Sequence, residues 1–190
     1  MDKKVVKLQP FQFPASYFGP VLTGKGGVFN ICGATGLFDK TIEISHNFKT
    51  ILYFAPKELQ LYDRNNNVIA NINRKPFSKN CKILNKSRHE IGLITKVPKM
   101  LGRDYMCQMN DGMAFYVSRT KNWTFVYFKN SKGRLLARHH SKFVMFGPSI
   151  SKIDISSNLD PVLMILLFCC IEEIAEQQKN EEVATLSSVS

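Results

Sequence analysis

The chain has 190 residues, which suits one domain with a hydrophobic core of its own. Apolar residues make up 44% and charged residues 22%, ordinary values for a soluble globular protein and not those of a disordered chain. Lys and Arg outnumber Asp and Glu by 26 to 15, which favours polyanionic partners, meaning anionic lipid headgroups or nucleic acid.

The excess of positive charge is confined to the first five sixths of the chain. Residues 1–159 carry 25 basic and 9 acidic side chains, whereas residues 160–190 carry 1 basic and 6 acidic side chains. The basic partner surface is therefore expected before residue 160. Its attraction to a polyanion should weaken as salt rises.

Residues 1–20 predict an irregular N-terminal arm. Prolines alternate there with aromatic residues. Proline interrupts the hydrogen bonding of a β-sheet because it lacks a backbone N–H, whereas aromatic rings favour burial. The arm is expected to lie pinned across the surface of the domain. The residues are Pro10, Pro14 and Pro20, with Phe11, Phe13, Tyr17 and Phe18 between them.

From residue 21 to about residue 155 the chain predicts short strands joined by turns. Thr41 to His46 alternates with a period of two, which directs one face of a strand toward a core. A strand–turn–strand repeat begins its turns at Asp63, Asn85 and Asn130, and a small residue follows each of them seven places later. Asn110-Asp111-Gly112 marks a further hairpin. A meander of this length must close or be covered to hide its edges.

Residues 160–177 predict one hydrophobic helix. Asp160 is a good N-cap, Pro161 suits the first helical position, and the apolar run continues to Ile171. Eleven apolar residues are fewer than the roughly 20 that span a membrane, so a helix buried in the core is expected rather than a transmembrane span. A short tail anchor is the competing interpretation. Residues 179–190 predict a disordered polar tail.

A meander followed by one apolar helix resembles the tubby-like superfamily and, within it, is similar to the LURP-one-related and phospholipid scramblase families. The resemblance covers about residues 40–176 and is carried by the three repeats, by Gly133 to His139, by Ile153 to Asp160, and by Val162 to Glu173. It implies a mainly β fold, an antiparallel barrel of about twelve strands enclosing the C-terminal helix, over residues 21–178. It also implies a role at membranes, because tubby-like domains hold phosphoinositide headgroups in a basic pocket.

The chain departs from the scramblase pattern at two places. It lacks the cysteine-rich run that would be palmitoylated, and residues 146–152, just before the helix region, contain no acidic residue. Calcium prefers several carboxylate or carbonyl oxygens together, so calcium-driven scrambling is not expected.

The sequence gives little support for catalysis. His139 and His140 are adjacent, so on a strand they point to opposite faces and cannot easily share a metal. No nucleophile with a base and an orienting group is evident. We expect a binding module rather than an enzyme, with no cofactor and no metal.

The candidate site is basic. Residues 112–153 contain eight Lys and Arg and no acidic side chain, and residues 74–103 contain nine against only Glu90. The turn positions of Lys129, Lys132 and Arg134 suit them best to reach headgroups. The full set predicted to bind lipid headgroups is Lys129, Lys132, Arg134, Arg138, Arg119, Lys121, Lys82, Lys86 and Arg88. Trp123, Phe125 and Tyr127 could stack on nucleic-acid bases, but alternation favours the core for Phe125 and Tyr127.

Three functions follow from these observations. The first is a module for anionic membrane lipid with phosphoinositide-type headgroups, and the second is a lipid scramblase. The third is a nucleic-acid-binding or regulatory protein, and a protein partner stays open. The chain has five cysteines without a C-x-x-C pair and a charged N-terminal segment, Met1 to Lys4. These features favour an intracellular location, either cytoplasmic or peripheral at the inner face of the membrane, with the nucleus as another option.

Overall fold

The structure is a computed structural model. It describes residues 8, 16–18, 27–33, 41–75, 78, 80–98, 103–120, 122–140, 150–157 and 159–187.

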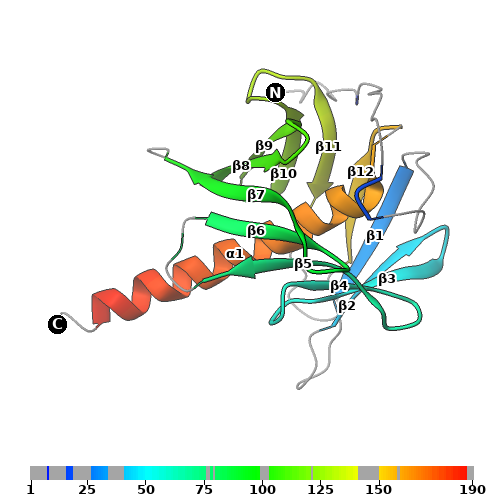
Figure 1. Cartoon of the computed structure of the whole chain (residues 1–190), viewed down its shortest axis with the longest axis horizontal. Coiled ribbons are helices and arrows are strands. Elements are labelled where there is room, and N and C mark those ends of the chain that lie inside the picture. The colour runs from blue at the N-terminus through cyan, green and yellow to red at the C-terminus, as the bar shows by residue number, and fades with distance from the viewer. Residues whose placement is uncertain are drawn as a thin grey trace.

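Twelve antiparallel strands form a closed barrel, in which each strand pairs with its neighbours in sequence and β1 pairs with β12 (Figure 1). The first six strands are β1 (Gly27–Gly33), β2 (Ile42–His46), β3 (Lys49–Ala55), β4 (Gln60–Asp63), β5 (Val68–Arg74) and β6 (Asn80–Asn85). The others are β7 (Glu90–Val97), β8 (Arg103–Met109), β9 (Ala114–Arg119), β10 (Trp123–Phe128), β11 (Leu135–His140) and β12 (Ile150–Ile155). The expected antiparallel barrel with one C-terminal helix is confirmed.

The repeated hairpins owe their turns to the side chain at the end of the first strand. Oδ1 of Asp63 accepts hydrogen bonds from the amides two and four residues further on, at 2.8 and 2.9 Å. Oδ1 of Asn85 accepts the equivalent pair at 3.0 and 3.1 Å, and Oδ1 of Asn130 accepts the amide two residues on, at 3.0 Å. These bonds replace backbone partners in the turn, so Asp and Asn specify where each strand reverses.

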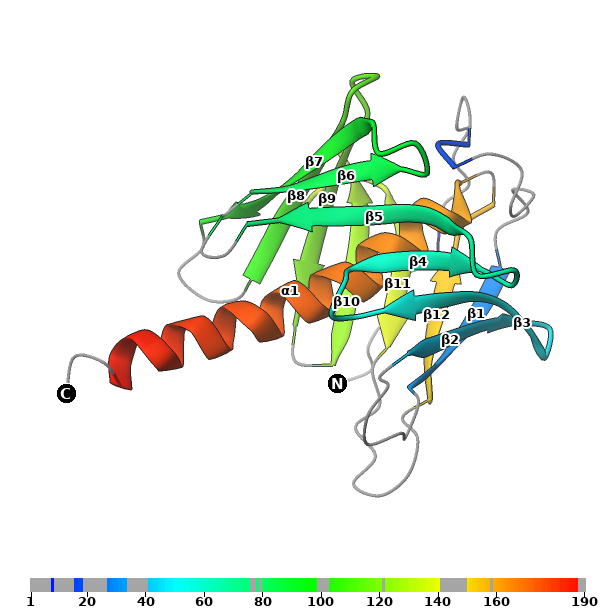
Figure 2. The same cartoon turned by 60° about the horizontal axis from the view of Figure 1, so that its bottom comes forward.

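The helix α1 (Pro161–Ser187) runs through the barrel and fills it (Figures 1 and 2). Every residue from 162 to 171 is buried, so this segment is core on all sides. The small residues that follow the repeated turns are also buried: Ala70 and Ala137 are fully buried, and a Cβ on Gly92 would stand 2.8 Å from Sδ of Met109 on β8. The apolar run therefore serves as the core of the domain.

Asp160 joins the start of the helix to the N-terminal arm. Its Oδ1 accepts the amide of Val162 at 2.9 Å, which caps the helix. Its Oδ2 accepts the amide of Tyr17 at 2.8 Å and the hydroxyl of Ser16 at 3.1 Å. The described part of the arm is thus held at the mouth of the barrel where α1 begins.

The helix is longer than the sequence predicts. It continues to Ser187 and so includes residues for which a disordered tail is expected. Two causes favour the extension: residues 179–187 include helix formers such as Glu, Ala and Leu, and Arg74 of β5 pairs with Glu181 at 2.8 Å. The guanidinium of Arg74 also donates to Oε1 of Gln177 at 3.1 Å. In both views the last part of α1 projects beyond the barrel (Figures 1 and 2).

The expected direction of Phe125 and Tyr127 is wrong. Thr124 and Val126 are buried in the barrel, whereas Phe125 and Tyr127 lie half-buried on its outer wall. The ring of Phe125 stacks on Trp123 with centroids 5.7 Å apart. The inward positions of β10 are taken by Thr124, whose hydroxyl donates to Oε1 of Glu172 on α1 at 2.8 Å, and by Val126, so the rings between them face outward. None of the described helices is long and apolar enough for a membrane crossing.

The two ends of the barrel differ. Alternate turns of an antiparallel meander lie at the same end, so one end carries the β2–β3, β4–β5, β6–β7, β8–β9 and β10–β11 turns. We call this end the hairpin rim: residues 47–48, 64–67, 86–89, 110–113 and 129–134. β12 runs toward it, so α1 begins there and leaves through the opposite end, the exit rim.

Candidate functional site

The hairpin rim brings together five of the predicted headgroup-binding residues. Two lie in the β6–β7 turn and three in the β10–β11 segment, and only β8 and β9 separate the two hairpins in the barrel. All five are exposed. They are Lys86, Arg88, Lys129, Lys132 and Arg134.

The acidic residues at these turns are engaged in other contacts. Asp63 caps its own turn, and Asp111 accepts a hydrogen bond from the Tyr17 hydroxyl at 2.6 Å. Glu90 pairs with Lys82 at 2.7 Å. Within the described part of the chain, Lys86, Arg88 and Lys132 form no ion pair, and the ammonium of Lys129 lies 5.2 Å from the centre of the Phe128 ring. Positive charge at the rim therefore remains available to an anion.

The structure places the other predicted residues elsewhere. Lys82 lies on the outer wall and is bound to Glu90, and Arg138 lies on the outer wall with Nε 2.7 Å from Asp154. Arg119 points into the barrel because it follows the inward positions 115 and 117 on β9. It pairs with Glu172 of α1 at 2.6 Å. Lys121 lies outside the described residues.

Three rim residues have an unfavourable backbone conformation. Phe48, Arg88 and Lys129 have φ values of 63°, 60° and 66°, in the left-handed region that non-glycine residues rarely occupy. The other two turns use residues that tolerate it, Asn66 at 61° and Gly112 at 89°. Sequence reasoning missed Phe48. The signal was Asn47-Phe48 between paired strands, because Asn-Gly is common in a two-residue hairpin turn.

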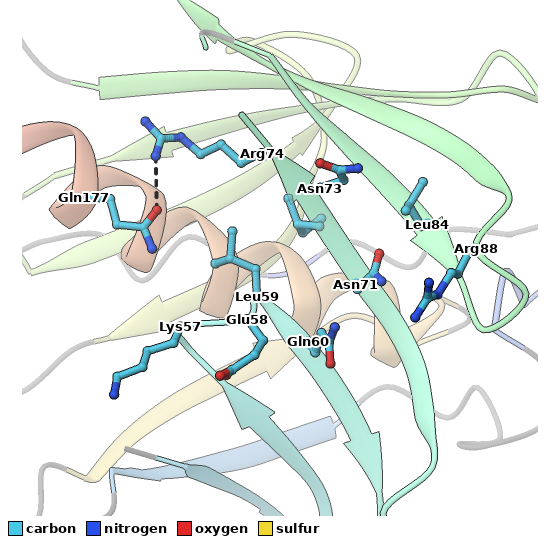
Figure 3. A pocket seen from close by; sticks show the side chains of 11 residues that line it. Lys57, Glu58, Leu59, Gln60, Asn71, Asn73, Arg74, Leu84, Arg88 and Gln177 are labelled. Carbon is cyan, nitrogen blue, oxygen red and sulfur yellow. Dashed lines mark hydrogen bonds between the residues drawn. The ribbon is translucent and has the colours of Figure 1, made fainter. Parts of the chain in front are cut away.

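A polar hollow of about 460 Å³ lies over β4, β5 and β6 and reaches the helix (Figure 3). Four side-chain amides and four charged side chains, one of them the acidic Glu58, line it, with Arg88 at one side and Lys57 at the other (Figure 3). The buried Oδ1 of Asn71 has no hydrogen-bond partner among the described residues. The lining residues are Lys57, Glu58, Leu59, Gln60, Asn71, Ile72, Asn73, Arg74, Leu84, Arg88 and Gln177. Arg88 thus belongs both to the hairpin rim and to this hollow.

A cluster of polar side chains lies inside the barrel near the exit rim, around Glu172. Its Oε2 accepts Nε and a terminal nitrogen of Arg119 at 3.1 and 2.6 Å, and its Oε1 accepts the Thr124 hydroxyl at 2.8 Å. Burial raises the pKa of Glu172, but the hydrogen bonds and charge of Arg119 outweigh it, so the pKa lies below its ordinary value. The cluster ties α1 to β9 and β10.

His139 extends this cluster toward β12. Its Nε2 lies 2.8 Å from Oγ of Ser151, and its Nδ1 lies 3.9 Å from Oε1 of Glu172, too far for a hydrogen bond. Burial lowers the pKa of His139 despite the attraction of Glu172. Ser, His and Glu thus stand in a row, but Ser151 is only 8% exposed and Glu172 is already bound by Arg119 and Thr124. The geometry suits a structural link better than nucleophilic attack.

Metal and thiol chemistry have little support among the described residues. No group of three or more His, Cys, Asp or Glu side chains there could hold a metal ion. None of the five cysteines forms a disulfide in the structure. Burial raises the pKa of the Cys81 thiol to about 11, which disfavours the reactive thiolate.

Comparison with known proteins identifies one structural likeness and no family. No protein-family model matches this sequence, and no curated protein matches it. Among solved structures, the chain is similar to the X-ray structure of a protein from Arabidopsis thaliana, AT5G01750, with 12% sequence identity and a TM-score of 0.38. The match covers 80% of this chain and 94% of the other.

Proposed function

We propose that the protein is a binding module for anionic membrane lipid, and that the hairpin rim is the surface that meets the headgroups. One observation carries the proposal: Lys86, Arg88, Lys129, Lys132 and Arg134 come from two hairpins and lie at the same end of the barrel. Each Lys or Arg near an anionic leaflet contributes about 1 kcal/mol, so several acting together give useful membrane binding.

The hollow, which shares Arg88 with the hairpin rim and extends from there toward the exit rim, supports a phosphoinositide-type headgroup as the preferred ligand. Its amide side chains at positions 60, 71 and 73 can bind hydroxyl groups, and the guanidinium of Arg88 can bind a phosphate. The resemblance of the sequence to tubby-like domains implies the same class of ligand. The Arg88 side chain would then contact both the headgroup in the hollow and the anionic lipids around it.

Vesicle flotation tests the proposal with a matched pair of variants. The rim variant Lys129→Ala/Lys132→Ala/Arg134→Ala should bind anionic vesicles roughly a hundredfold more weakly, because three contributions of about 1 kcal/mol are lost. The control Lys75→Ala/Lys96→Ala/Lys152→Ala removes the same charge from the side of the barrel away from the rim and should change binding much less. Vesicles with and without phosphoinositide, at equal surface charge, separate headgroup recognition from general attraction.

Equal losses in the two variants would refute the hairpin rim as the binding surface. Unchanged vesicle binding by the rim variant, together with lost binding to RNA or DNA, would replace the lipid by a nucleic acid. High salt should reduce the difference between wild type and the rim variant, because the charges are then screened.

A further inference from the structure

Phe48 is the most exposed apolar side chain among the described residues. It is fully exposed, while the other two large apolar residues with exposed surfaces, Val28 and Val183, keep about half of theirs covered. Phe48 is the second residue of the two-residue β2–β3 loop, since His46 pairs with Lys49. Its ring therefore stands at the tip of a hairpin on the hairpin rim.

This position is unfavourable for phenylalanine in water on two counts. The φ of 63° disfavours a side chain of this size, and the ring gains nothing from contact with the barrel. The same rim uses Asn66 and Gly112 where two other turns need a positive φ. Backbone strain of this kind is concentrated at functional sites, where the surrounding structure maintains it.

The strained residues are distributed regularly around the rim. Phe48, Arg88 and Lys129 lie in the β2–β3, β6–β7 and β10–β11 hairpins, and two strands separate each hairpin from the next around the closed barrel. One is aromatic and two are cationic. An anionic bilayer is the partner that accepts both kinds at one surface, the cations at its phosphates and the ring at its acyl boundary.

We propose that Phe48 inserts into the apolar boundary of an anionic bilayer when the hairpin rim docks on it. The proposal rests on the proposed function and adds the depth and the orientation of docking. In this arrangement the β2–β3 tip is the part of the barrel that penetrates furthest, and α1 leaves the barrel on the side away from the lipid.

The first experiment compares Phe48→Gly with wild type. Glycine accepts the positive φ without strain, so the variant should melt about 2–4 °C higher. Its partition onto phosphatidylcholine–phosphatidylserine vesicles should fall roughly tenfold, because the buried ring is lost. The dependence of binding on salt should stay as in wild type, since no charge has changed. Val183→Ala, which trims an exposed apolar residue on the projecting helix, is the control and should leave partition unchanged.

The second experiment measures how deeply residue 48 enters the bilayer. In the variant Phe48→Trp/Trp123→Phe, tryptophan stands only at position 48. With the same vesicles its emission should move to shorter wavelength, and lipids brominated along their acyl chains should quench it. Binding without quenching, or a Phe48→Gly variant that binds as well as wild type, would overturn insertion while leaving the proposed function intact. A wild-type protein that does not bind the vesicles at all would overturn both.

Discussion

Arg88 occupies the place in its turn that Asn66 occupies in the β4–β5 turn. Each follows the capping residue, Asn85 or Asp63, by three positions, and their φ values are 60° and 61°. Asparagine tolerates this conformation, whereas arginine is strained in it by about 1 kcal/mol. The charge of Arg88 at the rim is therefore present at a small cost in stability.

Replacing Arg88 by Asn should separate stability from binding. The free energy of unfolding, measured with urea, should rise by about 0.5–1 kcal/mol because the strain is relieved. Vesicle affinity should fall roughly fivefold, because about 1 kcal/mol of attraction is lost. A variant that is less stable than wild type would show instead that the Arg88 side chain supports the fold.

His139 gives the stability a dependence on pH. Because its pKa in the folded protein lies below the ordinary value of 6.5, the unfolded chain binds the proton more readily between the two values. Stability is therefore expected to increase as pH rises through this window below about 6.5. Glu172 acts in the same direction at lower pH, since its folded pKa is lowered from 4.5.

His139→Gln removes the titrating group while keeping a polar side chain beside Ser151. In urea unfolding between pH 5 and pH 7, the variant should lose much of the increase in stability that wild type shows over that range. An identical slope in the two proteins would mean that His139 keeps its ordinary pKa in the folded state.

At the scale of residues, the sequence predicts which cations lie in turns, because the Asp and Asn at positions 63, 85 and 130 mark the turns themselves. It does not predict that Arg119 points inward. The direction of its side chain depends on which alternate residues of β9 face the barrel interior. A charged residue at the end of a strand is compatible with either direction in the sequence, and the inward one is explained only by the ion pair with Glu172 of α1. Phe48 is missed because only the first residue of its turn, Asn47, is typical of a two-residue hairpin, while phenylalanine stands where glycine is usual.

Among the elements, α1 supplies the buried apolar segment that fills the barrel formed by the strands. Leu166 is fully buried within it, so Leu166→Asp should abolish soluble folding, since an unpaired buried charge costs several kcal/mol. Val183→Asp introduces the same charge at an exposed position of the same helix and should leave the melting temperature within a few degrees of wild type. Circular dichroism and size-exclusion chromatography of both variants make the comparison. A folded Leu166→Asp protein that merely loses membrane association would favour the tail-anchor interpretation.

The beginning of α1 follows from its sequence, and its end does not. Asp160 and Pro161 fix the start through capping and a preset backbone. The extension to Ser187 depends partly on the pairing of Arg74 with Glu181, a contact between residues 107 positions apart. The direction of Phe125 likewise depends on a long-range contact, the hydrogen bond from Thr124 to Glu172 of α1, which directs Thr124 inward and its neighbour outward.

The whole molecule is electrically polar. The hairpin rim collects Lys and Arg, whereas the described part of α1 from Glu172 onward carries several glutamates toward the exit rim. A helix of 27 residues is about 40 Å long, several times the Debye length of about 8 Å at physiological salt. With the hairpin rim on an anionic surface, the acidic part of the helix points away from that surface, and dissolved salt screens the repulsion between the two.

Charge reversal on the helix tests this orientation. Glu176→Lys changes the charge by two at an exposed position, yet it should alter affinity for anionic vesicles less than twofold at physiological salt. Arg134→Ala changes the charge by only one and should have the larger effect. A Glu176→Lys protein that binds several-fold more tightly would place the helix, not the hairpin rim, against the lipid.

The helix comes after all twelve strands in the sequence, so the ribosome releases the wall of the barrel before the segment that fills it. Until α1 is made, inward residues such as Leu52, Phe54 and Leu61 have no partner to cover them, and β1 must wait for β12, since Gly27 pairs with Ile155. The nascent chain therefore carries an open sheet with an apolar face and an unpaired edge, the kind of intermediate that aggregates unless it is protected. We expect cellular yield to depend on chaperones that hold this sheet until the helix arrives.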